Sequence, residues 1–166
     1  MGVIFTGYYE HAVDAKNRLA IPAKFRSRMD PEQDGKGFVV VPGQPPDRLW
    51  LYTEKHFDRL AARANSALIP DDNQLQFEQV FFPLAEYLEL DSQGRILLPE
   101  KMLARAGLGR EVVICGVRDH LEIRRRDDFE RELESSWQRY RELQLKAREA
   151  YSDVGRHPGP PEAGSS

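Results

Sequence analysis

The sequence predicts an α+β fold made from a duplicated unit, in which two similar halves share one core. The first observation is a nine-residue pattern that occurs twice, as DAKNRLAIP over 14–22 and as DSQGRILLP over 91–99. The second is that similar segments follow both copies in the same order, which indicates that a whole structural unit is repeated. The third is length. Half of a 166-residue chain is too short to bury much core alone, so we expect one pseudo-symmetric domain.

Each copy of the pattern predicts a turn that leads into a short strand. A short carboxylate at the start of a turn can accept hydrogen bonds from backbone amides further along, and Asn and Gly tolerate a left-handed backbone best. The predicted turn-forming residues are Asp14 and Asn17 in the first copy and Asp91 and Gly94 in the second. Apolar residues then alternate over 19–21 and 96–98, which is typical of strands with one buried face.

A proline ends each of these strands and begins a helix. Proline suits the first position of a helix, because the N–H that it lacks would have no partner there. The sequence therefore predicts helices over 22–29 and 99–106, the second of them closed by Gly107.

The remainder of each copy predicts an apolar strand, a turn, a second strand and another helix. In the first copy the strands are expected over 38–41 and 49–52, and a helix follows from about Thr53, whose hydroxyl can serve as its N-cap. In the second copy the strands are expected over 112–115 and 121–123. The first copy has an additional segment over 30–36, which we interpret as a surface loop.

The C-terminal part predicts one long helix from 128 to 151, followed by a disordered Pro-rich tail over 152–166. An apolar stripe on this helix can pack on its own domain or against a neighbouring subunit, and both interpretations stay open. Its residues are Phe129, Leu133, Trp137, Tyr140 and Ala147. The predicted domain boundaries are 7–55 for the first repeat, 56–83 for a linker helix and loop, 84–127 for the second repeat, 128–151 for the C-terminal helix and 152–166 for the tail.

Basic residues gather at and after the two turns. The candidate DNA-binding residues are Lys16, Arg18, Lys24, Arg26 and Arg95. The alternative is an internal pair of each turn arginine with the aspartate four residues before it. The two roles are compatible, because the guanidinium group has several donors. The second turn has Gln93 in place of Lys16, so we expect the first turn to contribute more to DNA binding.

The two D-x-x-x-R motifs, the PAKFR segment over 22–26 and the LDSQGRILLP segment over 90–99 resemble the MraZ family of bacterial transcriptional regulators. The likeness extends over about residues 3–137. It implies tandem SpoVT-AbrB-like halves, with swapped-hairpin β-barrels, whose D-x-x-x-R loops contact DNA. It further implies a ring-shaped homo-oligomer in the cytoplasm and on the nucleoid. That oligomer binds direct repeats in double-stranded DNA upstream of the division and cell-wall gene cluster, its own promoter included.

The chain departs from the family pattern at two places. Asn17 stands where the family usually has glycine, which should preserve the turn. The family often has Trp-Asp after the last strand, where this chain has 122–125 with the sequence EIRR.

Other functions fit the sequence less well. An AbrB-like antitoxin that caps a protein partner is the main alternative, but it is expected to carry one motif and a partner-wrapping tail. The histidines show no metal-ligand spacing, and no nucleotide-binding loop is present, so no enzyme activity, metal or cofactor is expected. No apolar run is long enough for a membrane span, and the lone Cys115 excludes an internal disulfide.

The overall charge of the chain does not favour a nucleic acid partner. The net charge is -3 and the isoelectric point is about 5.8. DNA binding must therefore depend on local charge, and the segment 16–28 contains basic residues and no acidic ones.

Overall fold

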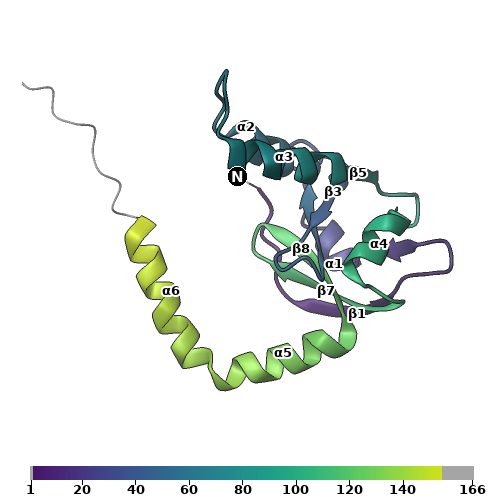
Figure 1. Ribbon diagram of the computed structural model, residues 1–166. Helices are drawn as coiled ribbons and strands as arrows, with labels where there is room; N and C mark the ends of the chain where they lie inside the picture. Colours follow the sequence, from purple (N-terminus) through teal and green to yellow (C-terminus); the bar gives the residue numbers. More distant parts are fainter. Residues whose placement is uncertain (1, 155–166) are drawn as a thin grey trace, which may run out of the picture. The chain divides into compact units, whose positions relative to one another are not determined.

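The computed structural model describes residues 2–154 and divides into two compact units, 1–128 and 129–166. The fold is α+β and its strands all pair antiparallel (Figure 1). The strands are β1 (Tyr8–Ala12), β2 (Arg18–Ala20), β3 (Gly37–Pro42), β4 (Leu49–Thr53), β5 (Glu86–Glu89), β6 (Arg95–Leu97), β7 (Glu111–Val117) and β8 (His120–Arg125). The helices are α1 (Ala23–Arg26), α2 (Glu54–Ala62), α3 (Asp72–Leu84), α4 (Glu100–Ala106), α5 (Arg126–Gln138) and α6 (Tyr140–Val154).

The strand pairings have an internal two-fold symmetry. One sheet has the order β1-β7-β8-β4-β3-β5, and a separate two-stranded ribbon pairs β2 with β6. Exchanging the two halves of the chain maps each sheet onto itself. In the six-stranded sheet the exchange leaves the pair Trp50 and Glu122 in place, and in the ribbon it leaves the pair Leu19 and Ile96 in place. The pairing thus agrees with the predicted pseudo-symmetric domain.

Each half supplies an edge strand to the other half. β1 of the first half pairs with β7 of the second, and β5 of the second half pairs with β3 of the first. Neither edge strand was predicted, because YYEHA and EYLE contain few apolar residues and no regular buried face. Since neither half completes its sheet alone, the two halves depend on each other for folding.

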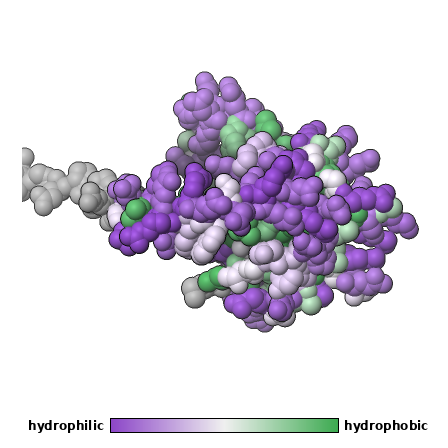
Figure 2. All heavy atoms as spheres, turned by 90° about the horizontal axis from the view of Figure 1, so that it is seen from below, coloured by the Kyte–Doolittle hydropathy of each residue, from purple (hydrophilic) through white to green (hydrophobic). Residues whose placement is uncertain are grey.

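The main core lies between the inner face of the six-stranded sheet, the ribbon and the helices α1 and α4. Leu19 and Ile96 at the centre of the ribbon are fully buried in it. A second cluster lies on the opposite face of β3 and β4, where Phe57 of α2 and Phe81 of α3 pack against Val39 and Val41. Because helices or strands cover both faces of β3, its sequence GFVVVP is a continuous apolar run. The face seen in Figure 2 is largely hydrophilic, with apolar residues in scattered patches.

The predicted helices at the end of the chain and in the linker are corrected by the structure. The expected helix over 128–151 is two helices, α5 and α6, which are separated at Arg139. No glycine or proline marks this break, so its position could not be seen in the sequence. α6 continues to Val154, so 152–154 are helical, and the rest of the predicted tail lies outside the described residues. The linker over 56–83 holds a second helix, α3, where one helix and a loop were expected.

Smaller differences concern helix ends. α1 is shorter than the predicted 22–29 and covers Ala23–Arg26. Thr53 occupies the N-cap position of α2, but its side chain makes no capping hydrogen bond. The extra segment over 30–36 is anchored by buried Asp34, whose carboxylate accepts hydrogen bonds from the backbone N–H of Val3 and Asp30. Within residues 2–154, none of the helices has the length and apolar character that crossing a membrane requires.

Candidate nucleic-acid interface

The first turn is closed by its aspartate. Asp14 Oδ1 accepts hydrogen bonds from the backbone N–H of Lys16 at 2.9 Å and of Arg18 at 2.8 Å. The Asn17 N–H donates to the Asp14 carbonyl at 3.0 Å, and Asn17 has a φ of 61°. This left-handed conformation is the one for which Asn is suited.

The second turn has the same hydrogen bonds. Asp91 Oδ1 accepts from the backbone N–H of Gln93 at 2.8 Å and of Arg95 at 3.0 Å, and Gly94 has a φ of 74°. Asn17 and Gly94 therefore do the same work, and the departure from glycine in the first motif leaves the turn intact.

Both turn arginines are held by the aspartate of their own turn. Arg18 Nε donates to Asp14 Oδ2 at 2.7 Å, and Arg95 Nε donates to Asp91 Oδ2 at 2.8 Å. Among the described residues, no acceptor binds the terminal nitrogens of either guanidinium group. The internal pair thus orients each arginine and leaves further donors for a ligand.

The hydrogen bonds of the turns also keep the two aspartates charged. The backbone N–H of Arg18, followed by its side chain and the N–H of Lys16, holds the pKa of Asp14 below its usual 3.8, although desolvation opposes this. The backbone and side chain of Arg95 and the N–H of Gln93 lower the pKa of Asp91 in the same way. Both carboxylates therefore remain ionised over the ordinary pH range.

The ribbon brings the two arginines onto one surface. Leu19 and Ile96 point into the core, so the alternating residues of the same strands point outward. These outward residues are Arg18, Ala20, Arg95 and Leu97. Arg18 pairs with Leu97 and Arg95 pairs with Ala20, which places the Cα atoms of the two arginines about 8 Å apart. A two-stranded ribbon of this kind has the width of the DNA major groove.

The two halves also fix each other's turns. Ile21 N–H donates to the Gly94 carbonyl at 2.9 Å, and Leu98 N–H donates to the Asn17 carbonyl at 2.8 Å. Because each turn carbonyl is bound by the strand of the other half, the two arginines are held in a fixed relationship.

Arg26 lies at the second turn, although it belongs to the first repeat. Its Nε donates to the Ile21 carbonyl at 2.9 Å, and a Cβ built on Gly94 would stand 2.5 Å from Arg26 Cζ. The second turn therefore has Arg26 beside Arg95, although it lacks a counterpart of Lys16. The equivalent position in the second repeat is Leu103 of α4, which lines a depression together with Asn17 of the first turn.

The other predicted residues lie as follows. Lys16 is exposed at the first turn, and Lys24 is exposed on α1 with its Nζ 6.0 Å from the centre of the Tyr9 ring. Arg110 was not predicted, yet it is exposed and lines the same depression as Asp14 and Asn17. No local pattern marks Arg110, because only the fold of the chain brings it to the first turn.

The chain was compared with known families and proteins. The family described as "MraZ protein, putative antitoxin-like" matches residues 4–77 and 81–148. The chain belongs to the MraZ family. The family predicted from the sequence is thereby confirmed, and the match extends over both halves.

Curated MraZ relatives resemble the chain over most of its length. The Transcriptional regulator MraZ of Thermomicrobium roseum is 40% identical over 121 residues, which are 72% of this chain and 80% of the relative. Its namesake from Acetivibrio thermocellus is 36% identical over 120 residues, again 72% and 80%. That of Ligilactobacillus salivarius is 35% identical over 127 residues, 76% and 85%. Membership of the MraZ family places the protein among transcription regulators and not among enzymes.

Proposed function

We propose that the protein is a sequence-specific DNA-binding transcription regulator, and that the β2–β6 ribbon is its DNA-contacting surface. The observation that carries this proposal is the register of the ribbon, in which Arg18 and Arg95 share one outward face while Leu19 and Ile96 anchor the other face in the core. Arg is the residue that most often contacts guanine in the major groove, where its two parallel donors match O6 and N7.

The cations around the ribbon supply the sequence-independent part of the affinity. Lys16, Arg26 and Arg110 lie at the two turns and are placed to contact phosphates. This local charge opposes the net charge of -3 of the whole chain. Binding should therefore depend strongly on salt concentration, because each phosphate contact releases counterions from the DNA.

We further propose that the two halves form the AbrB-like arrangement of interlocked hairpins. The exchange of β1 and β5 between the halves supports this, as do the cross-half hydrogen bonds of the two turns. The resemblance to the MraZ family supports direct repeats upstream of the division and cell-wall gene cluster as the target, with the protein located on the nucleoid.

A ring of several chains fits this target. The internal two-fold symmetry relates the halves to each other, but the first half continues into α2 and α3 and the second into α5 and α6. Different faces that meet head to tail generate a ring when the rotation closes. A ring would present several ribbons to repeats spaced about 10 base pairs apart, and linked sites can raise avidity about 100-fold or more.

Fluorescence anisotropy with a labelled duplex tests the DNA-binding proposal. The duplex carries the region upstream of the protein's own gene, and a scrambled duplex of the same length serves as the control. We expect tighter binding to the upstream duplex, with an affinity that falls linearly with salt on a logarithmic plot. Equal binding to both duplexes would contradict sequence specificity, and no binding to either would favour the antitoxin-like alternative.

A further inference from the structure

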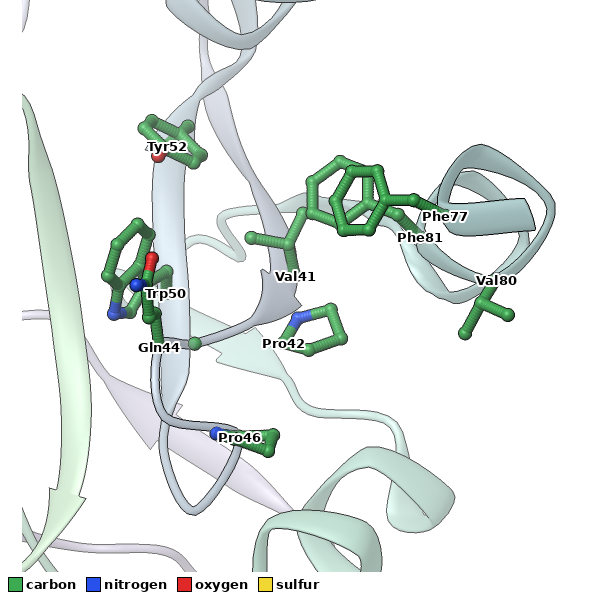
Figure 3. A pocket seen from close by; sticks show the side chains of 10 residues that line it. Val41, Pro42, Gln44, Pro46, Trp50, Tyr52, Phe77, Val80 and Phe81 are labelled. Carbon is green, nitrogen blue, oxygen red and sulfur yellow. The ribbon is translucent and has the colours of Figure 1, made fainter. Parts of the chain in front are cut away.

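An apolar groove lies on the face of unit 1 that α2 and α3 occupy, outside the proposed DNA-contacting surface. Its volume is about 360 Å³. Phe77 and Phe81 point from α3 toward the strands, and Trp50 and Tyr52 of β4 lie across from them (Figure 3). Phe77 and Val80 are 62% and 60% exposed, which is far more than their own fold requires. An exposed cluster of this size on one face marks an interaction site.

Unit 2 carries an apolar stripe of matching character. Leu133, Trp137 and Tyr140 are spaced at i, i+4 and i+7, the positions by which a helix anchors itself in a groove. Trp137 and Tyr140 are 68% and 51% exposed, and their ring centres are 5.4 Å apart. These two rings therefore form a compact aromatic pair next to the break between α5 and α6.

The charges of the two surfaces are complementary. α3 contains Asp72 and Glu78 and has no basic residue. The segment 135–141 around the aromatic pair contains Arg139 and Arg141 and has no acidic residue. Opposite charges around two apolar surfaces favour their association over the pairing of either surface with itself.

We propose that the groove of unit 1 binds the Leu133–Trp137–Tyr140 stripe of a second copy of this chain. The contact joins two different surfaces, so it is head to tail and adds one chain after another. It identifies the interface of the proposed ring and rests on that part of the proposed function, but it needs no DNA.

Two variants of the full chain disrupt one surface each. Val80→Asp places a charge at the rim of the groove, and Trp137→Ala with Tyr140→Ala removes the aromatic pair. Leu68→Asp is the matched control, because Leu68 is fully exposed and lies outside the groove. We measure native mass and sedimentation without DNA. The wild-type chain and the Leu68→Asp control should form the same large oligomer, and each interface variant should be a single chain.

Mixing the two interface variants gives the decisive result. One variant keeps an intact stripe and the other an intact groove, so the mixture should form a heterodimer of two chains and nothing larger. Interface variants that remain oligomeric would overturn the proposal, as would two monomeric variants that do not combine. The first of these results would also be obtained if the stripe bound the groove of its own chain.

A second variant tests another occupant of the groove. Aromatic grooves also bind Pro-rich segments, and the chain contains Pro158, Pro160 and Pro161. Changing these three prolines to serine should leave the oligomer intact, and dissociation would overturn the proposal in favour of the Pro-rich segment. DNA binding is measured separately, so a failed interface would not be confused with a failed DNA-contacting ribbon.

Discussion

Arg26 and Gly94 come from different halves of the chain, and the guanidinium group of Arg26 occupies the space where a side chain at position 94 would begin. Glycine at this position is therefore required twice, once by its φ of 74° and once by Arg26. The contact joins the first helix of one repeat to the DNA-contacting turn of the other.

Gly94→Ala should lower the free energy of unfolding by about 1–3 kcal/mol, because alanine must adopt a left-handed conformation and displace Arg26. Arg26→Ala in the same chain should recover part of this loss, giving a coupling energy of about 0.5 kcal/mol or more. Urea unfolding at one fixed protein concentration measures the four variants of the cycle. Asn17→Ala is the control, because the first turn has the same conformation without Arg26 and should show no coupling. Simple additivity of Gly94→Ala and Arg26→Ala would show that the contact has no energetic role.

Lys16→Ala should weaken DNA binding and reduce its dependence on salt. If Lys16 contacts one phosphate, the slope of the logarithm of affinity against the logarithm of salt falls by about 0.9 for each bound subunit. Anisotropy titrations at several salt concentrations measure this slope. Gln93→Ala changes the equivalent, uncharged position of the second turn and should leave the slope unchanged. An unaltered slope in Lys16→Ala would remove Lys16 from the set of phosphate contacts.

His120 should make the stability of the protein depend on pH. Its Nδ1 lies 2.9 Å from Asp119 Oδ1 and its Nε2 lies 3.3 Å from Glu122 Oε1, and carboxylates only accept hydrogen bonds, so the ring is held in its protonated form. Burial lowers the pKa of His120, but the hydrogen bonds to Glu122 and Asp119 outweigh it and raise the pKa above 6.5. A raised pKa stabilises the fold below pH 6.5, and this stabilisation is lost as the pH rises through the pKa of the folded state.

The urea midpoint at pH 6 and at a pH above 8 measures this effect. We expect the midpoint of the wild-type protein to fall as the pH rises, and the fall to be smaller in His120→Gln. His11→Gln is the control, because burial lowers the pKa of His11 and its removal cannot abolish the fall. A wild-type midpoint that stays constant over this range would show that His120 is not protonated in the folded protein.

The local parts of the fold could be predicted because their chemistry is contained in a few neighbouring residues. Asn17 and Gly94 have the left-handed conformation that their residue types indicate, and Gly107 ends α4 with a φ of 66°. The apolar strands were predicted for the same reason. Cys115 was expected to be buried and is 6% exposed, and burial raises the pKa of its thiol to about 11.

The parts that depend on pairing between distant segments could not be predicted. β1 and β5 are strands because the other half offers them an edge, and their own sequences do not indicate a buried face. Arg26 was grouped with the first turn because it is near in sequence, whereas the crossing of the two halves places it at the second. Arg110 reaches the first turn in the same way, through the fold of the second half.

The DNA-contacting role of the β2–β6 ribbon is tested most directly by the affinity of Arg18→Ala and Arg95→Ala for the upstream duplex. Arg63→Ala is the matched control, because Arg63 is an exposed arginine at the end of α2 and away from the ribbon. Circular dichroism verifies that each variant is folded. We expect Arg18→Ala to lose specific binding, Arg95→Ala to bind more weakly than wild type but better than Arg18→Ala, and Arg63→Ala to bind normally. Loss of one bidentate contact to a base corresponds to about 1–3 kcal/mol for each bound site. Normal binding by folded Arg18→Ala and Arg95→Ala proteins would contradict the assignment of the ribbon as the DNA-contacting surface.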